Sequence, residues 1–115
     1  MDHKDLDVWR KSIDAVIMLY ELTAGFSQTE VYGLTQQLRR AAVSIPSNIA
    51  EGAARNSDKE FIQFLYIALG SLSEVETQII IARRLAYIRE DHNVLAGLKD
   101  IRKMLTGLIN YLKKK

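Results

Sequence analysis

The chain of 115 residues contains no cysteine, one proline, six glycines and two histidines. The absence of cysteine excludes a disulfide framework, a thiol nucleophile and any cysteine-ligated zinc or iron–sulfur site. So few glycines and prolines also leave little turn chemistry for a fold that depends on many hairpins. Because 48% of the residues are hydrophobic, and many of these are leucine, isoleucine and alanine, the composition predicts an all-α protein with a substantial core.

Targeting and membrane segments are also not evident. No uninterrupted apolar run approaches the about 20 residues that a membrane-spanning helix needs. The first seven residues, MDHKDLD, are acidic and polar, whereas a secretory signal begins with basic residues and continues with an apolar stretch of about 7–15 residues. We therefore expect a cytoplasmic protein that does not interact with a membrane.

Catalytic motifs are missing as well. His3 and His92 lie in the N-terminal arm and in a predicted loop, and neither is at helical spacing from a mid-helix carboxylate. The chain has no phosphate-binding glycine loop, no Gly-x-Ser-x-Gly motif and no His-Glu-x-x-His motif. We expect no catalytic residue, no metal ligand and no cofactor. The alternative is an enzyme whose site inside the bundle carries no known motif.

Apolar residues recur at spacings of three and four in four segments, which is the pattern of an amphipathic helix. The segments cover about residues 6–24, 30–54, 57–86 and 91–115. The joins between them are short, and short joins make consecutive helices antiparallel. The sequence therefore predicts one domain over residues 1–115, an up-down-up-down antiparallel four-helix bundle.

Local signals refine these segments. Ser57 and Glu60 have the spacing of a capping box and predict the start of the third helix. Pro46 lies inside the second segment, where proline removes a backbone hydrogen bond and predicts a kink or a break into two helices. The predicted apolar face of the first segment consists of Leu6, Trp9, Ile13, Val16, Ile17 and Tyr20, and that of the last consists of Val94, Leu98, Ile101, Leu105, Leu108 and Leu112.

The third segment has two apolar stripes, although a helix in a monomeric bundle needs only one. The main stripe contains Phe61, Leu65, Leu72, Val75 and Ile79, and a separate stripe contains Phe64, Ile67, Ile81 and Leu85. In a monomer the second stripe would be an exposed apolar patch, so it is a candidate oligomer interface. The alternative is a wide core-facing surface on a central helix.

The net charge of +2 hides an uneven distribution. Residues 1–30 contain six acidic and three basic residues, whereas residues 87–115 contain seven basic and three acidic ones. The basic side chains are candidates for contact with nucleic-acid phosphates, and these candidates are Arg39, Arg40, Arg55, Arg83, Arg84, Lys99, Arg102, Lys103 and Lys113. The alternative is a solvated helix face with cations near a helix C-terminus, where the helix dipole favours them.

The stretch of residues 39–55 combines small residues, a proline and several polar groups in a few helical turns. Asn48 and Glu51 are three apart and share a helix surface, and Glu51 and Arg55 are four apart in the favourable orientation for an ion pair. One interpretation is a kinked helix whose polar groups are satisfied locally. The other is a polar interface, which makes Asn48 and Glu51 candidate oligomer contacts.

Residues 39–52, RRAAVSIPSNIAEG, resemble the hallmark of the four-helix proteins encoded in intervening sequences of bacterial 23S ribosomal RNA genes, the S23 family. LDVW at 6–9, YGLTQQL at 32–38 and ALGSLSEVE at 68–76 match as well. The resemblance implies a four-helix bundle and a ring-shaped homopentamer. It also implies kinship with the accessory variability protein of diversity-generating retroelements, a basic pentameric barrel that associates with reverse transcriptase and nucleic acid. No settled activity comes with the family.

These observations favour a non-enzymatic, homo-oligomeric scaffold or adaptor. Its candidate partners are copies of itself, RNA or DNA bound non-specifically through basic faces, and a protein such as a reverse transcriptase. The alternative hypothesis is a purely structural or protein-binding oligomer without a role in nucleic-acid binding.

Overall fold

The computed structural model describes residues 1–89 and 92–115. Four long helices account for most of them: α1 (Asp7–Thr23), α2 (Leu34–Ala53), α3 (Asp58–Arg84) and α4 (Val94–Lys114). Two short 3₁₀ helices, η1 (His3–Asp5) and η2 (Gln28–Glu30), precede α1 and α2. The all-α prediction is confirmed. The predicted start of the last helix at Asp91 lies outside the described residues, and the helix is present from Val94.

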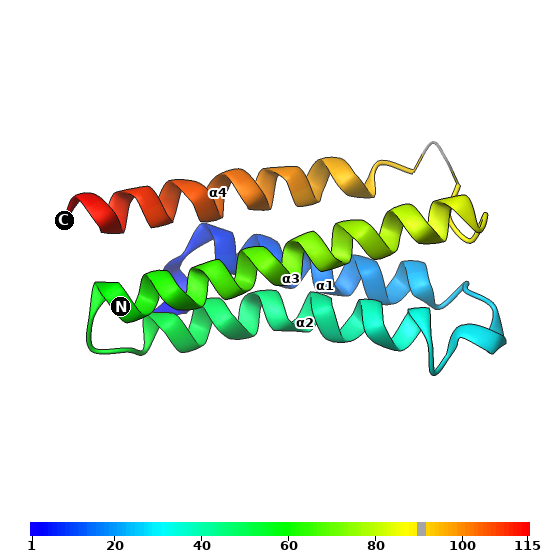
Figure 1. The fold of residues 1–115 in the computed structure, drawn as a ribbon, viewed down its shortest axis with the longest axis horizontal. Coiled ribbons are helices and arrows are strands. Elements are labelled where there is room, and N and C mark those ends of the chain that lie inside the picture. Colours follow the sequence, from blue (N-terminus) through cyan, green and yellow to red (C-terminus); the bar gives the residue numbers. More distant parts are fainter. Residues whose placement is uncertain (90–91) are drawn as a thin grey trace.

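Consecutive helices run antiparallel along the long axis of the molecule, which measures 46 × 25 × 20 Å. Helix α1 packs against α2 and α4, and α3 packs against the same two helices. Figure 1 shows that each helix lies beside its neighbours in the chain and that α4 returns the C-terminus to the end where α3 begins. This is the predicted up-and-down four-helix bundle.

The core contains the main apolar stripe predicted for α3 and most of the apolar face predicted for α4. Leu65, Leu72 and Ile79 are fully buried, and in α4 Ile109 is buried, whereas the predicted Leu108 is only partly buried. The predicted face of α1 is correct for Leu6, Trp9 and Val16, which pack against the core, and wrong for Ile17 and Tyr20. Val8, Ala15 and Leu19 point into the core, and Ile17 and Tyr20 are exposed.

The predicted capping box at the start of α3 is confirmed. The Ser57 hydroxyl accepts a hydrogen bond of 3.2 Å from the Glu60 backbone N–H, and it donates one to the Glu60 carboxylate. At the start of α2 a carboxylate from outside the helix has the same role, because Glu30 Oε1 accepts from the Leu34 N–H at 3.2 Å. Side-chain acceptors therefore define both N-termini.

Helix α2 is continuous through Pro46, so the predicted break into two helices is wrong. A bend at Pro46 stays a prediction. Proline removes the backbone donor that the Ala42 carbonyl would accept from, and its ring is buried on the side of α2 that faces α1. Packing therefore keeps the helix intact across a residue that is unfavourable in helix interiors.

Helix α3 is long and apolar enough to cross a membrane by length and composition, and it is the one such helix among the described residues. Its most apolar window has a mean hydropathy of 1.3 and is 33% buried in the bundle. The core helix of a soluble protein passes the same test, and α3 packs against both α2 and α4. Part of its apolar surface nevertheless stays exposed on the single subunit.

Candidate functional site

The outer side of the α2–α3 pair carries a polar cluster at its centre. Ser44 of α2 and Ser71 of α3 share a hydrogen bond of 2.8 Å between their hydroxyls. The Asn48 amide nitrogen donates to the Ser44 carbonyl at 2.7 Å and to the Ser44 hydroxyl at 2.8 Å. Further along α2, Arg55 forms the predicted ion pair with Glu51 at 3.1 Å. Beside the cluster, a hollow of about 320 Å³ is lined partly by Arg40 and the serines.

Apolar side chains of α3 lie at both ends of this cluster. Ile67 precedes it and is 50% exposed, while Ile81 and Leu85 follow it and are 44% and 51% exposed. Phe64 is partly buried under the Arg55 guanidinium, whose central carbon lies 4.7 Å from the ring centroid. Asn48 contacts Ser44 beside Ser71, and Arg55 joins Glu51 to Phe64, while helical spacing places Ile67 and Ile81 near the same side of α3. We call this surface the α2–α3 face, and its members are Asn48, Glu51, Phe64, Ile67, Ile81 and Leu85.

A second apolar surface lies between α1 and α2. It is a groove of about 340 Å³ lined by Trp9, Ile13, Ile17, Val43 and Pro46, which we call the α1–α2 groove. Ile17 is 55% exposed and Val43 is 40% exposed. Sequence reasoning missed this surface, because it placed Ile13 and Ile17 on the core side of α1.

Five of the nine predicted phosphate-binding residues already have partners within the chain. Arg39 donates from Nε to the Thr23 hydroxyl at 2.8 Å and from Nη2 to the Tyr20 carbonyl at 3.1 Å. Arg83 donates to the His92 carbonyl, and Arg55 pairs with Glu51. These three side chains fix helix ends and loops in place.

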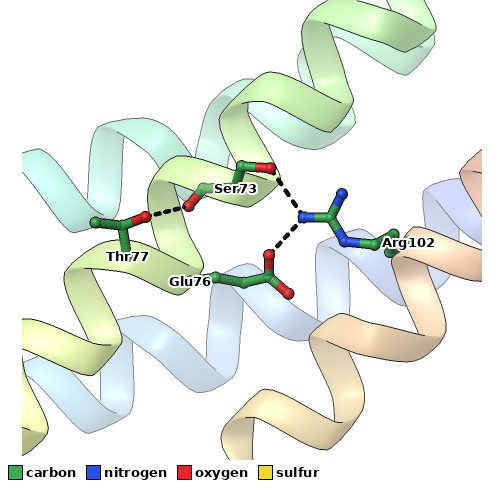
Figure 2. A network of polar contacts seen from close by, with 4 residues as sticks. All are labelled: Ser73, Glu76, Thr77 and Arg102. Carbon is green, nitrogen blue, oxygen red and sulfur yellow. Dashed lines mark hydrogen bonds and ion pairs between the residues drawn. The ribbon is translucent and has the colours of Figure 1, made fainter.

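The last two of these five join α4 to α3. Arg102 donates from Nη2 to the Ser73 hydroxyl at 2.9 Å and also to the Glu76 carboxylate, as Figure 2 shows. Lys113 donates to the Tyr66 hydroxyl at 2.8 Å. Both cations cross between helices, so they contribute to the docking of α4.

The remaining four candidates, Arg40, Arg84, Lys99 and Lys103, are exposed. Within residues 1–89 and 92–115 they make no hydrogen bond or ion pair to another side chain. Lys99 and Lys103 are four apart and lie on the same side of α4, while Arg40 and Arg84 belong to α2 and α3. The structure therefore supplies free cations on three helices rather than one continuous basic patch.

The Arg102–Glu76 pair should contribute little to stability. Their side chains are 37% and 26% exposed, and an ion pair this accessible to water is screened. A double-mutant cycle with Glu76→Gln and Arg102→Met, measured by urea unfolding, should give a coupling energy below about 1 kcal/mol. The exposed Asp7–Arg10 pair is the control and should give a smaller value. A coupling above about 2 kcal/mol, insensitive to salt, would contradict this expectation.

A tyrosine ties the loop after α3 to the segment before α2. The Tyr87 hydroxyl donates to Glu30 Oε2 at 2.9 Å, and the carboxylate raises the pKa of Tyr87 above its ordinary value of 10.0. Because the pKa is raised in the folded protein, the contribution of this contact to stability is fully present at neutral pH. It is lost as the pH rises above the ordinary tyrosine pKa and through the raised one.

Among the described residues there is no group of three or more histidine, cysteine, aspartate or glutamate side chains that could hold a metal ion. The polar clusters that the structure does assemble consist of hydroxyls, amides and ion pairs. Groups of this kind can position a surface or contact a partner.

The comparisons with known proteins agree with this fold. A family model described as "23S rRNA-intervening sequence protein" matches residues 4–107. The chain is also similar to a protein of unknown function from the S23 ribosomal protein family of Bacteroides thetaiotaomicron VPI-5482, whose crystal structure is known. The two share 25% sequence identity with a TM-score of 0.79, over 89% of this chain and 97% of the other. No curated protein matches. The chain belongs to the 23S rRNA-intervening sequence protein (S23) family, as its sequence motifs predicted.

Proposed function

We propose that this protein is a non-enzymatic, cytoplasmic scaffold or adaptor that assembles into a ring of five identical subunits. The observation that carries the proposal is the presence of two different exposed apolar surfaces, the α2–α3 face and the α1–α2 groove. Contiguous exposed apolar patches on small proteins mark interaction sites. The number five is what the family resemblance implies.

Two different surfaces favour a ring over a dimer. A dimer with twofold symmetry uses the same patch on both subunits, whereas a ring places one patch of each subunit against a different patch of the next. The α2–α3 face presents side chains, and the α1–α2 groove is a hollow that can receive them. Helix α2 contributes residues to both, so the two surfaces lie on adjacent sides of the bundle.

The solution mass tests this proposal. Light scattering after size exclusion should give five times the subunit mass of 13.1 kDa at micromolar concentration. A monomer at that concentration would contradict the scaffold proposal as a whole. A dimer would contradict the ring alone.

We further propose that the ring contacts RNA or DNA non-specifically through the four unpaired cations. A ring repeats Arg40, Arg84, Lys99 and Lys103 around its axis. The copies of these cations together form an extended positively charged array, although the net charge of each subunit is modest. Each phosphate contact releases counterions, and binding then weakens steeply as salt rises.

A pair of charge variants tests this contact. The variant with Lys99→Gln and Lys103→Gln should lose most of its affinity for a single-stranded RNA at low salt. The slope of log affinity against log salt concentration should also be shallower for this variant, by about 0.7 for each phosphate that it no longer neutralises. The control, Lys4→Gln with Lys59→Gln, removes the same charge elsewhere and should bind like the wild type. No binding by the wild-type protein at low salt, or an equal loss of affinity in the control, would contradict the proposal.

The second candidate function is a purely structural or protein-binding ring, with a partner such as a reverse transcriptase. The observation that favours it is the use of Arg39, Arg83 and Arg102 in contacts within the chain. Glu51→Ala separates the two functions, because Glu51 lies on the α2–α3 face and carries no positive charge. Loss of assembly in Glu51→Ala, together with no RNA binding by the wild-type protein at low salt, favours the structural role.

A further inference from the structure

A pocket of about 440 Å³ lies at one end of the bundle, between the C-terminal end of α1 and the first turns of α2. Its volume falls within the range of small-molecule sites in proteins, about 300–1,000 Å³. The lining includes Tyr20, Tyr32, Thr35, Arg39 and Arg40. Arg39 and Tyr20 contact each other at the end of α1, but these contacts do not account for Tyr32 and the buried Thr35 beside them.

Thr35 supplies the first sign of a ligand. Thr35 is one of the residues that line the pocket, it is only 7% exposed, and its buried hydroxyl has no hydrogen-bond partner in the described part of the chain. Buried hydroxyls are nearly always paired, because an unpaired one loses its hydration without compensation. The backbone N–H groups of Thr35 and Gln36 belong to the first turn of α2 and have no acceptor within the helix.

Two arginines add positive charge to these donors. The Arg39 guanidinium is held by the Thr23 hydroxyl and the Tyr20 carbonyl, and it lies 4.4 Å above the Tyr20 ring. These contacts fix its orientation before any ligand arrives, and they do not use Nη1. The nearby carboxylate of Glu30 is occupied by the Leu34 N–H and the Tyr87 hydroxyl. An anion is therefore the chemistry that the pocket is built to accept.

Aromatic rings define the rest of the ligand. Tyr32 is 89% exposed beside the arginines, and the stacked Tyr20–Arg39 pair offers a second flat surface. Planar bases bind to proteins by stacking on tyrosine rings and arginine planes. The pocket offers more hydrogen-bond donors than the two oxygens of a carboxylate would use. The positive charges of Arg39 and Arg40 match the two negative charges of a phosphate dianion.

We propose that this pocket binds a nucleoside 5′-phosphate, either free or at the end of a strand. The phosphate contacts Arg39, Arg40 and the Thr35 hydroxyl, and the base stacks against Tyr32. The inference goes beyond the proposed scaffold, since it requires neither the ring nor the cations of α4.

Titration calorimetry with adenosine 5′-monophosphate tests it. AMP should bind at least tenfold more tightly than adenosine or inorganic phosphate, because the pocket offers contacts to both halves of the nucleotide. Thr35→Val, which keeps the shape but removes the unpaired hydroxyl, should weaken AMP binding about tenfold without lowering thermal stability. Arg40→Gln should weaken it similarly, and Arg84→Gln, which removes a charge elsewhere, should have no effect.

Oligonucleotides with and without a 5′-phosphate distinguish the two sources. A preference of the pocket for the phosphorylated strand that disappears in Thr35→Val assigns a strand end, and AMP binding without that preference assigns a free nucleotide. Both outcomes support the proposal. No AMP binding at millimolar concentration, equal affinity for AMP and inorganic phosphate, or full affinity in both pocket variants would overturn it. The Lys99→Gln and Lys103→Gln variant should retain AMP binding, so a failed nucleic-acid surface is distinguishable from a failed pocket.

Discussion

Two variants that are each monomeric should form a dimer when they are mixed. Ile81→Glu places a carboxylate on the α2–α3 face, and Ile17→Glu places one in the α1–α2 groove. Each should abolish assembly, because burying an unpaired carboxylate in an apolar contact costs several kcal/mol, or more than about 100-fold in affinity. In a ring, the intact groove of the first variant still matches the intact face of the second, so the mixture yields one heterodimer and no larger species.

Native mass spectrometry of an equimolar mixture, with one variant isotopically labelled, measures this result. Both substituted side chains are about half exposed in the subunit, so neither substitution should unfold the bundle. A mixture that stays monomeric would contradict the ring, and a dimer formed by either variant alone would show that the intact patch pairs with itself.

Ile80→Glu is the matched control. Ile80 directly precedes Ile81 and is 46% exposed, but it lies on the side of α3 that carries Ser73, seven residues earlier, whose hydroxyl accepts from Arg102 of α4. We expect this variant to remain fully assembled. Dissociation by Ile80→Glu would mean that general apolarity of α3, and not the α2–α3 face, drives association.

Periodicity predicted the fold because each helix has a strong apolar pattern, but it could not always tell which side of a helix faces inward. The main stripe predicted for α3 is correct, because Leu65, Leu72 and Ile79 are buried in the core. The face predicted for α1 is wrong in part, because this helix is apolar on more than one side and packs against both α2 and α4. The larger Ile17 and Tyr20 lie outside, and the smaller Ala15 lies in the core.

The local contacts of the candidate site could be predicted, and the long-range ones could not. The Glu51–Arg55 pair follows from a spacing of four residues and is confirmed. The partner of Arg102 is 26 residues away, and that of Lys113 is 47 residues away. Such partners depend on how helices dock, so charge alone made Arg102 and Lys113 candidates for phosphate contact although both have partners within the chain. The isolation of the Thr35 hydroxyl also depends on packing and has no sequence signal.

Helix α2 lies close to α3 at Gly52, and adding one methyl group there should destabilise the protein. A Cβ atom at Gly52 would lie 2.7 Å from the Phe64 Cβ, 2.9 Å from the Phe61 Cδ1 and 3.2 Å from the Phe61 carbonyl oxygen. Two of these atoms belong to or adjoin the α3 backbone, so a side-chain rotation cannot relieve the clash. The two helices must separate.

Overpacking a core usually costs about 1–3 kcal/mol. Replacing a helical glycine returns up to about 1 kcal/mol, so Gly52→Ala should lower the free energy of unfolding by up to about 2 kcal/mol. Urea unfolding in the Ile81→Glu background measures the effect, because a monomer removes the contribution of assembly to stability.

Gly70→Ala provides the control of opposite sign. Gly70 is an exposed residue inside α3, and a Cβ there meets no atom within 4 Å. It should raise the free energy of unfolding by about 0.5–1 kcal/mol, since only the helix propensity changes. Stabilisation by both substitutions would show that α2 and α3 can separate freely at Gly52. Since Phe64 lies on the α2–α3 face, a rigid contact at Gly52 would also mean that this glycine sets the shape of the surface proposed to join the subunits.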